Sequence, residues 1–194
     1  MLTVSGLSGC DAGKGGKDGK GGKYAKDEAT ISARPERVDP GSAPLFPSTN
    51  KALAPDFEVT LLDGSRFSLK DARGKVMIMN IWATWCAPCK KETPDLVELY
   101  ETYASDGLVV FGVSVDEQGE SVVMPFVEEY SVSYPIFIDR SGEVMDQYGP
   151  TMGIPTTYII DRSGYFRYFA TGAVTKRELI SKIEPLLAES VDGQ

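Results

Sequence analysis

The stretch that decides the fold is residues 75–94, KVMIMNIWATWCAPCKKETP. Its first eight residues are nearly all apolar, which is typical of a β-strand that is buried on both faces. Two cysteines follow almost directly, and the apolar side chains at 96, 99, 100 and 103 then lie on one face of a helix. The sequence therefore predicts a strand over 75–82 that leads into a helix from about Cys86 to Tyr103.

This pattern places Cys86 at the N-terminus of the helix, where unpaired backbone N–H groups and the helix dipole favour a negative charge. The thiolate is the nucleophilic form of cysteine, so Cys86 is predicted to attack disulfides. Cys89 lies one turn further into the helix, which suits it to resolving a mixed disulfide. Pro88 stiffens the first turn without the loss of a hydrogen bond.

A Cys-x-x-Cys motif can also supply half of a zinc site or form a purely structural disulfide. Zinc needs two further Cys or His ligands, but the chain has no histidine and only one other cysteine, Cys10. A disulfide between Cys86 and Cys89 closes so short a loop that it adds little stability. We therefore expect no metal and no cofactor beyond a redox-active Cys86–Cys89 pair.

The second part of the chain has the pattern of an α/β domain. Alternating segments at 57–61 and 66–69 around Asp63-Gly64 predict a β-hairpin. A capping box at 175–178 opens the last helix. Strands that alternate with helices predict a central sheet with helices on its faces. The remaining predicted elements are strands at 108–115, 136–138, 156–160 and 165–170 and a helix at 121–130.

The motif at 85–89, with Pro94 after it and Gly-Ile-Pro-Thr at 153–156 before a late strand, resembles the thioredoxin fold. The hairpin, the Cys-Lys-Lys-Glu-Thr-Pro continuation and an insert around 117–140 resemble its membrane-anchored branch, the TlpA/ResA-like thiol–disulfide oxidoreductases. The resemblance implies an α/β, thioredoxin-like domain over 52–194. That domain would have a central mixed β-sheet, flanking helices and an N-terminal β-hairpin extension.

The resemblance also implies roles for individual residues. Cys86 would be the attacking cysteine and Cys89 the resolving cysteine. Pro155 would be a cis-proline that faces them and turns the backbone of Ile154 outward, where it can pair with an extended substrate segment. The residues expected to contact the substrate are Trp85, Ala87, Pro88 and Ile154.

One position departs from the family pattern. Ordinary thioredoxins carry a buried aspartate, the proton acceptor for the resolving cysteine, where this chain has Asn80. Because an amide does not titrate, another carboxylate or a water molecule must take the proton. The candidates are Glu92, three residues past Cys89 on a neighbouring helix face, and Asp116, just past the end of a strand. Each could instead be a solvated surface acid.

The resemblance implies an enzyme of thiol–disulfide exchange. The uncharged Ala-Pro pair between the cysteines favours the reducing direction. The implied partners are a membrane thiol donor and disulfide-containing proteins, and apocytochrome c is a common client of this branch. A peroxiredoxin-like peroxidase would carry proline and threonine where this chain has Met79 and Ala83. A non-enzymatic lipoprotein that only binds a partner leaves the cysteine pair unexplained.

Residues 1–51 of the 194-residue chain differ in composition from the predicted α/β domain. Leu7-Ser-Gly-Cys10 resembles a bacterial lipobox, which implies a truncated signal peptide over 1–10 and a lipid anchor on Cys10. Residues 11–51 are rich in Gly, Lys, Pro and Ser and predict a disordered tether that reaches roughly 35 Å. Residues 52–194 carry 12 basic and 22 acidic side chains, which argues against a nucleic-acid partner.

Together these features predict a monomer on the periplasmic side of the bacterial cytoplasmic membrane. A protein whose translation truly began at Met1 would lack a working leader and would stay in the cytoplasm.

Overall fold

The structure, a computed structural model, describes residues 43–48, 52–148 and 153–190. Cys10, the predicted lipobox and most of the predicted tether lie outside these residues. In the part of the chain that is described, no helix has the length and apolar character needed to cross a membrane.

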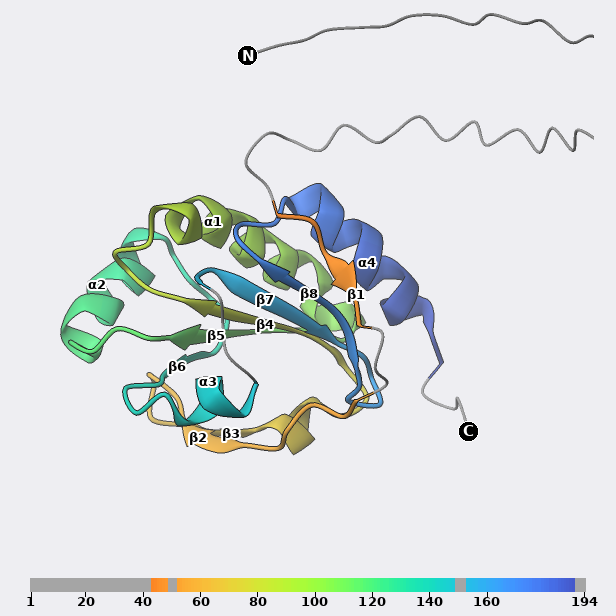
Figure 1. Ribbon diagram of the computed structural model, residues 1–194, viewed down its shortest axis with the longest axis horizontal. Coiled ribbons are helices and arrows are strands. Elements are labelled where there is room, and N and C mark those ends of the chain that lie inside the picture. The colour runs from red at the N-terminus through yellow and green to blue at the C-terminus, as the bar shows by residue number, and fades with distance from the viewer. Residues whose placement is uncertain (1–42, 49–51, 149–152, 191–194) are drawn as a thin grey trace, which may run out of the picture. The chain divides into compact units, whose positions relative to one another are not determined.

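The fold is built on a six-stranded mixed sheet with the strand order β1-β8-β7-β4-β5-β6 (Figure 1). β4 and β5 form its parallel centre, and all of their residues are buried, as expected for strands covered on both faces. β7 pairs antiparallel with β4 on one side, and β6 pairs parallel with β5 on the other. The strand bounds are β4 Val76–Trp82, β5 Leu108–Ser114, β6 Ile136–Ile138, β7 Thr156–Ile160 and β8 Phe166–Thr171.

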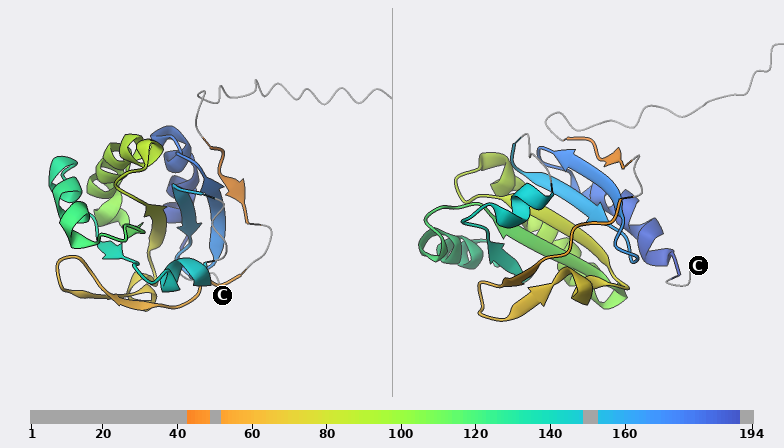
Figure 2. Two further views of the ribbon diagram at one scale, coloured as in Figure 1. Left: turned by 60° about the vertical axis from the view of Figure 1, so that its left-hand side comes forward. Right: turned by 60° about the horizontal axis from the view of Figure 1, so that its bottom comes forward.

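Helices and a hairpin cover the two faces of this sheet. α1 and α4 lie on one face, and α3 lies with the β2–β3 hairpin on the other (Figures 1 and 2). α2 contributes Val123 and Phe126 to the same apolar cluster as α1 and α4. The bounds are α1 Ala87–Tyr103, α2 Glu120–Glu129, α3 Glu143–Gln147, α4 Lys176–Ala188, β2 Glu58–Thr60 and β3 Arg66–Ser68, with short 3-10 turns at Leu69–Ala72 and Ala104–Asp106. The predicted thioredoxin-like α/β architecture is therefore confirmed.

Alternation along the central strands divides the core into two apolar clusters. On β4, Val76, Ile78 and Trp82 face α1 and α4. Met77, Met79 and Ile81 face the hairpin and α3. Because successive side chains of a strand point to opposite faces, Asn80 belongs to the α1 face. A polar side chain is thus placed in the core directly beneath the helix that carries the cysteines.

Residues 43–48 fall within the segment predicted to be a tether, but they lie on the sheet. β1 (Phe46–Pro47) pairs antiparallel with β8 at the edge of the sheet. Leu45 is buried, and its backbone N–H donates to Glu178 Oε1 at 2.6 Å. A two-residue strand has no periodicity of its own, and it forms here because β8 offers an open edge. The predicted end of the tether at residue 51 is therefore too late.

Phe111 joins the β2–β3 hairpin to the sheet, and its truncation should be costly. Its ring is fully buried and stacks on Phe67 with a centroid distance of 4.7 Å, and Phe57 lies at 5.2 Å. We expect Phe111→Ala to lower the free energy of unfolding by about 3–5 kcal/mol in urea denaturation, because it leaves a cavity. Phe46→Ala, at a ring that is 51% exposed, should cost less than about 1 kcal/mol. Equal losses in the two variants would contradict this account of the core.

Candidate active site

Cys86 and Cys89 form a disulfide at the start of α1, with an S–S distance of 2.03 Å. Cys86 is the N-cap residue of the helix, and the backbone N–H of Cys89 donates to Cys86 Sγ at 3.2 Å. The predicted place of Cys86 at a helix N-terminus is confirmed. A thiolate on Cys86 would be stabilised there by this N–H group and by the helix dipole.

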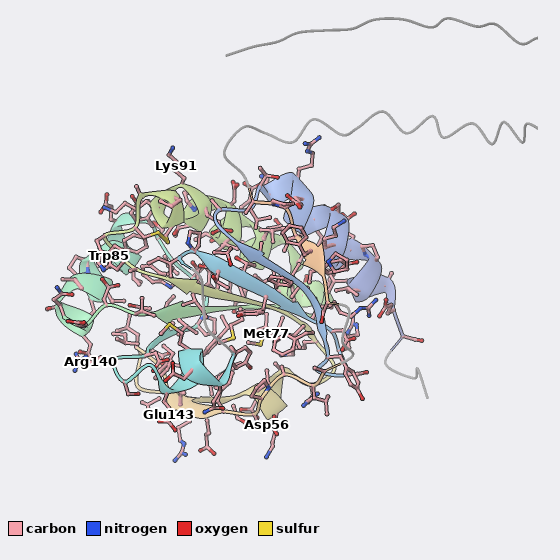
Figure 3. The ribbon with its side chains drawn as sticks, viewed as in Figure 1. Asp56, Met77, Trp85, Lys91, Arg140 and Glu143 are labelled. Atoms are coloured by element: carbon pink, nitrogen blue, oxygen red, sulfur yellow. A yellow bond between two sulfur atoms is a disulfide. The ribbon has the colours of Figure 1, made fainter. Side chains whose placement is uncertain are left out.

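The surroundings of the disulfide combine buried sulfur with exposed apolar groups. Both cysteines are buried, whereas Trp85, Ala87 and Pro88 are exposed, and Trp85 keeps 67% of its surface in contact with solvent. Figure 3 shows Trp85 at the end of the sheet where α1 begins. This arrangement offers an apolar surface around the reactive pair, and substrate contact by these three residues stays a prediction.

The Ile154–Pro155 peptide bond is cis, as predicted. It lies immediately before β7, whose Thr156 pairs with Ile81 near the end of β4. The cis-proline therefore lies at the end of the sheet where β4 ends and the chain continues to Cys86. Substrate contact through Pro155 and Ile154 also stays a prediction.

Glu92 is buried within α1, with 3% of its surface exposed. Asn80 Nδ2 donates to its Oε2 at 3.3 Å, and the backbone N–H of Val174 donates to its Oε1 at 3.1 Å. Burial raises the pKa of Glu92 from 4.5 to about 7, although the two hydrogen bonds act in the opposite direction. Glu92 is therefore not a solvated surface acid but a buried carboxyl that titrates near neutral pH, one helical turn from Cys89.

Asn80, which stands where ordinary thioredoxins carry an aspartate, is a hydrogen-bond partner of Glu92. Its amide donates to Glu92 and also to Thr157 Oγ1, the latter at 3.0 Å. The strand thus supplies a hydrogen-bond donor, and the titratable group comes from the helix. Because an amide does not titrate near neutral pH, Asn80 remains a hydrogen-bond donor whichever protonation state Glu92 adopts.

Asp116, the second candidate acid, is fully buried. The backbone N–H of Thr84 donates to its Oδ2 at 2.9 Å and the Thr84 hydroxyl donates to its Oδ1 at 2.7 Å. The Ser114 hydroxyl donates to Oδ2 at 2.9 Å. Both oxygens of Asp116 are therefore bonded to groups of the turn before Cys86 and of the end of β5, whereas Glu92 lies on the helix that carries Cys89.

The raised pKa of Glu92 predicts a pH-dependent stability. The fold favours the neutral carboxyl, so this contribution is fully present below about pH 4.5 and is lost as the pH rises through about 7. The loss is on the order of 3 kcal/mol. In urea denaturation of the oxidised protein, Glu92→Gln should gain stability relative to wild type on going from pH 5 to pH 8. A difference in the free energy of unfolding between Glu92→Gln and wild type that does not change with pH would contradict the raised pKa of Glu92.

Sequence reasoning missed two contacts of this site. Val174, which donates to Glu92, follows β8 and lies 82 residues further along the chain. Thr84, which is bonded to Asp116, lies next to the cysteine motif but has no pattern that would mark it. Spacing within one helix or strand carried no signal for either contact, because both join separate elements.

The fold, the cysteine pair at a helix N-terminus and the neighbouring cis-proline define a thioredoxin-fold thiol–disulfide oxidoreductase. The family model described as the AhpC/TSA family matches residues 51–169. The chain is 38% identical over 135 residues to the thiol-disulfide oxidoreductase ResA of Bacillus thuringiensis subsp. konkukian, over 68% of this chain and 77% of that protein. The thioredoxin-like protein YneN of Bacillus subtilis is 40% identical over 133 residues, 68% of this chain and 76% of its own length. The chain therefore belongs to the AhpC/TSA family and, within it, to the ResA-like thiol–disulfide oxidoreductases.

Solved structures share the fold. A putative thiol:disulfide interchange protein DsbE from Chlorobium tepidum aligns with a TM-score of 0.67 and 28% identity, over 73% of this chain and 100% of that chain. StoA from Bacillus subtilis aligns with a TM-score of 0.59 and 28% identity, over 67% of this chain and 97% of that chain. The protein is thus an enzyme whose reaction is thiol–disulfide exchange at Cys86 and Cys89.

Proposed function

We propose that this enzyme reduces protein disulfides outside the cytoplasm while it is tethered to the membrane. The observation that carries the proposal is the surface around the disulfide, where Trp85, Ala87 and Pro88 are exposed beside a buried Cys86. Such a surface suits an extended polypeptide better than a small polar substrate, since it offers apolar contact area around the reactive sulfur.

The reaction begins with the reduced enzyme. The Cys86 thiolate attacks one sulfur of the substrate disulfide, so that a mixed disulfide forms and the other substrate sulfur leaves as a thiolate. Cys89 then loses its proton and attacks Cys86 Sγ, which releases the second substrate sulfur. The substrate has gained two electrons, and the enzyme is left with the Cys86–Cys89 disulfide. A membrane thiol donor must reduce this disulfide before the next cycle, and no other cofactor is needed.

Glu92 is the proton acceptor for Cys89 in this scheme. Its position one turn along α1 and its pKa of about 7 support that role, because general bases work best when their pKa is close to the working pH. The buried carboxyl holds the proton while the second sulfur–sulfur bond forms. It would release that proton to solvent before the disulfide is reduced again.

The proposed attachment to the membrane depends on Cys10. Leu7-Ser-Gly-Cys10 resembles a lipobox, and a lipid on Cys10 would hold the folded domain near the membrane through the intervening segment. Proteins that await haem attachment, such as apocytochrome c, are suitable clients because their paired cysteines must be reduced first. Mass spectrometry of membrane fractions should find a lipid-modified Cys10 and none in Cys10→Ala. An unmodified N-terminal peptide in the wild-type membrane fraction would contradict the anchor.

The reducing direction can be tested on the purified domain. Titration of Cys86 and Cys89 against a glutathione or dithiothreitol buffer should give a potential more negative than about −200 mV, on the reducing side of protein disulfide isomerase. A value near about −120 mV, which is typical of a strong oxidant, would overturn the reducing direction. Peroxide consumption that depends on Cys86 would instead favour the peroxidase alternative.

A further inference from the structure

The turn between β4 and α1 carries the reactive cysteine and is held from β5 by one buried side chain. The carboxylate of Asp116 receives both the backbone N–H of Thr84, at 2.9 Å, and the Thr84 hydroxyl, at 2.7 Å. Thr84 precedes Cys86 by only two residues. The bonds therefore act on the backbone and the side chain of the residue that introduces the cysteine motif.

Asp116 is itself firmly placed. It is fully buried, as is Ser114, whose hydroxyl donates to Asp116 Oδ2 at 2.9 Å. The backbone N–H of Asp116 donates back to Ser114 Oγ at 3.1 Å. This pair of reciprocal bonds anchors the carboxylate to the end of β5, which is a central strand of the sheet. The Asp116 carboxylate is thus a rigid support and not a mobile surface group.

A buried carboxylate is costly unless its oxygens are satisfied. Among the ion pairs formed by the described residues, none includes Asp116, so its satisfaction depends on neutral donors. Thr84 supplies two of those donors, and Ser114 supplies the third. The two donors of Thr84 therefore offset most of the free-energy cost of burying the Asp116 carboxylate. Asp116 in return holds the turn that contains Thr84, so the turn and the carboxylate stabilise each other.

The turn needs such support because Trp85, between Thr84 and Cys86, is largely exposed and has little packing to hold it. We propose that Asp116 is a positioning residue, which acts through Thr84 to hold Cys86 against the N-terminus of α1. Its effect is to keep Cys86 Sγ in reach of the Cys89 N–H group, now 3.2 Å away, and so to stabilise the Cys86 thiolate of the reduced enzyme. The inference rests on thiol–disulfide exchange and is independent of the proposed direction, client and membrane anchor.

A second buried acid offers a matched control. Asp139 follows β6 much as Asp116 follows β5, and it is 3% exposed. Asp139 Oδ2 accepts the backbone N–H of Met145 at 2.8 Å, so this carboxylate holds the start of α3 and not the cysteine turn. Loss of Asp139 should disturb the fold without a change in the chemistry of the cysteine pair.

The test compares Thr84→Val, Thr84→Ser, Asp116→Ala and Asp139→Ala. Thr84→Val keeps the shape of the side chain and the backbone bond but removes the hydroxyl. The readout is the dithiol–disulfide equilibrium constant of Cys86 and Cys89 in glutathione buffers at pH 7, with thermal unfolding recorded in parallel. This measurement needs no substrate protein, no membrane and no electron donor, so it stays informative if the proposed function fails.

We expect Thr84→Val and Asp116→Ala to shift this equilibrium about tenfold toward the disulfide, which corresponds to about 30 mV for a two-electron couple. Thr84→Ser, which keeps the hydroxyl, should stay within twofold of wild type, and so should Asp139→Ala. The double variant of Thr84 and Asp116 should shift no further than Asp116→Ala alone, since both act through one contact. A Thr84→Val equilibrium within twofold of wild type, or shifted toward the dithiol, would overturn the proposal even if Asp116→Ala does not fold.

Discussion

Replacement of Cys86 by serine is expected to abolish the reduction of protein disulfides, with a loss of about 10³-fold or more. The hydroxyl of serine does not ionise near neutral pH, so the helix N-terminus that favours a thiolate has no nucleophile to activate. The measurement is the rate of insulin reduction with dithiothreitol as the electron donor, corrected for the rate without enzyme. Undiminished reduction by Cys86→Ser would remove this pair from the chemistry.

The serine variants of the two cysteines should stop the reaction at different steps, and this difference tests which cysteine attacks and which one resolves the mixed disulfide. Cys89→Ser keeps the attacking sulfur but cannot resolve the mixed disulfide, so it should accumulate a covalent complex with the substrate. Cys86→Ser should form no such complex. Cys10→Ser, in contrast, should leave the activity of the purified protein unchanged, because the role proposed for Cys10 is anchoring. A stable complex in Cys86→Ser and none in Cys89→Ser would reverse the assigned roles.

Glu92→Gln is expected to give the second-largest effect. It keeps the size and polarity of the side chain but removes the base, so the step in which Cys89 resolves the mixed disulfide should slow by about 10²-fold at pH 7. The sign of the pH dependence follows from the pKa of about 7 for Glu92. The wild-type rate should rise with pH through about 7 as the carboxyl ionises, and the variant should lack that rise. Rapid-mixing kinetics between pH 5.5 and 8.5 would measure both effects.

Glu98→Gln is a suitable control for this experiment. Glu98 lies on the same helix, is exposed, and bonds to Lys176 Nζ at 2.6 Å. Its replacement makes the same chemical change on the same helix without touching the buried network. Its pH–rate profile should match that of wild type. If Glu92→Gln also kept the wild-type profile, water or another group would be the proton acceptor for Cys89.

The central elements of the fold could be predicted because their signals are local. An apolar run predicted a strand at 75–82, and β4 spans Val76–Trp82. The same kind of signal predicted a strand at 108–115, and β5 spans Leu108–Ser114. In contrast, α3 is a single short helix without a marked apolar period, and its start is held by Asp139 through Met145. A helix of 5 residues is too short to show an apolar period, so it leaves little trace in a local pattern.

The sequence by itself determined the chemistry at the cysteines. A buried strand followed by Cys86-Ala-Pro-Cys89 and an amphipathic helix places Cys86 at a helix N-terminus, since each of those steps depends only on neighbouring residues. The choice between the two candidate acids was different, because in the sequence each could equally have been a solvated surface acid, whereas both are buried in the structure.

Only the tertiary structure shows how the surroundings of the two acids differ. Val174 and Asn80, from two other parts of the chain, hold Glu92 in an apolar core that raises its pKa. The carboxylate of Asp116 instead accepts hydrogen bonds from Thr84 and from Ser114 at the end of β5. A carboxyl's proton affinity depends on how far it is desolvated and which donors reach it, and both are set by elements that meet only when the chain folds.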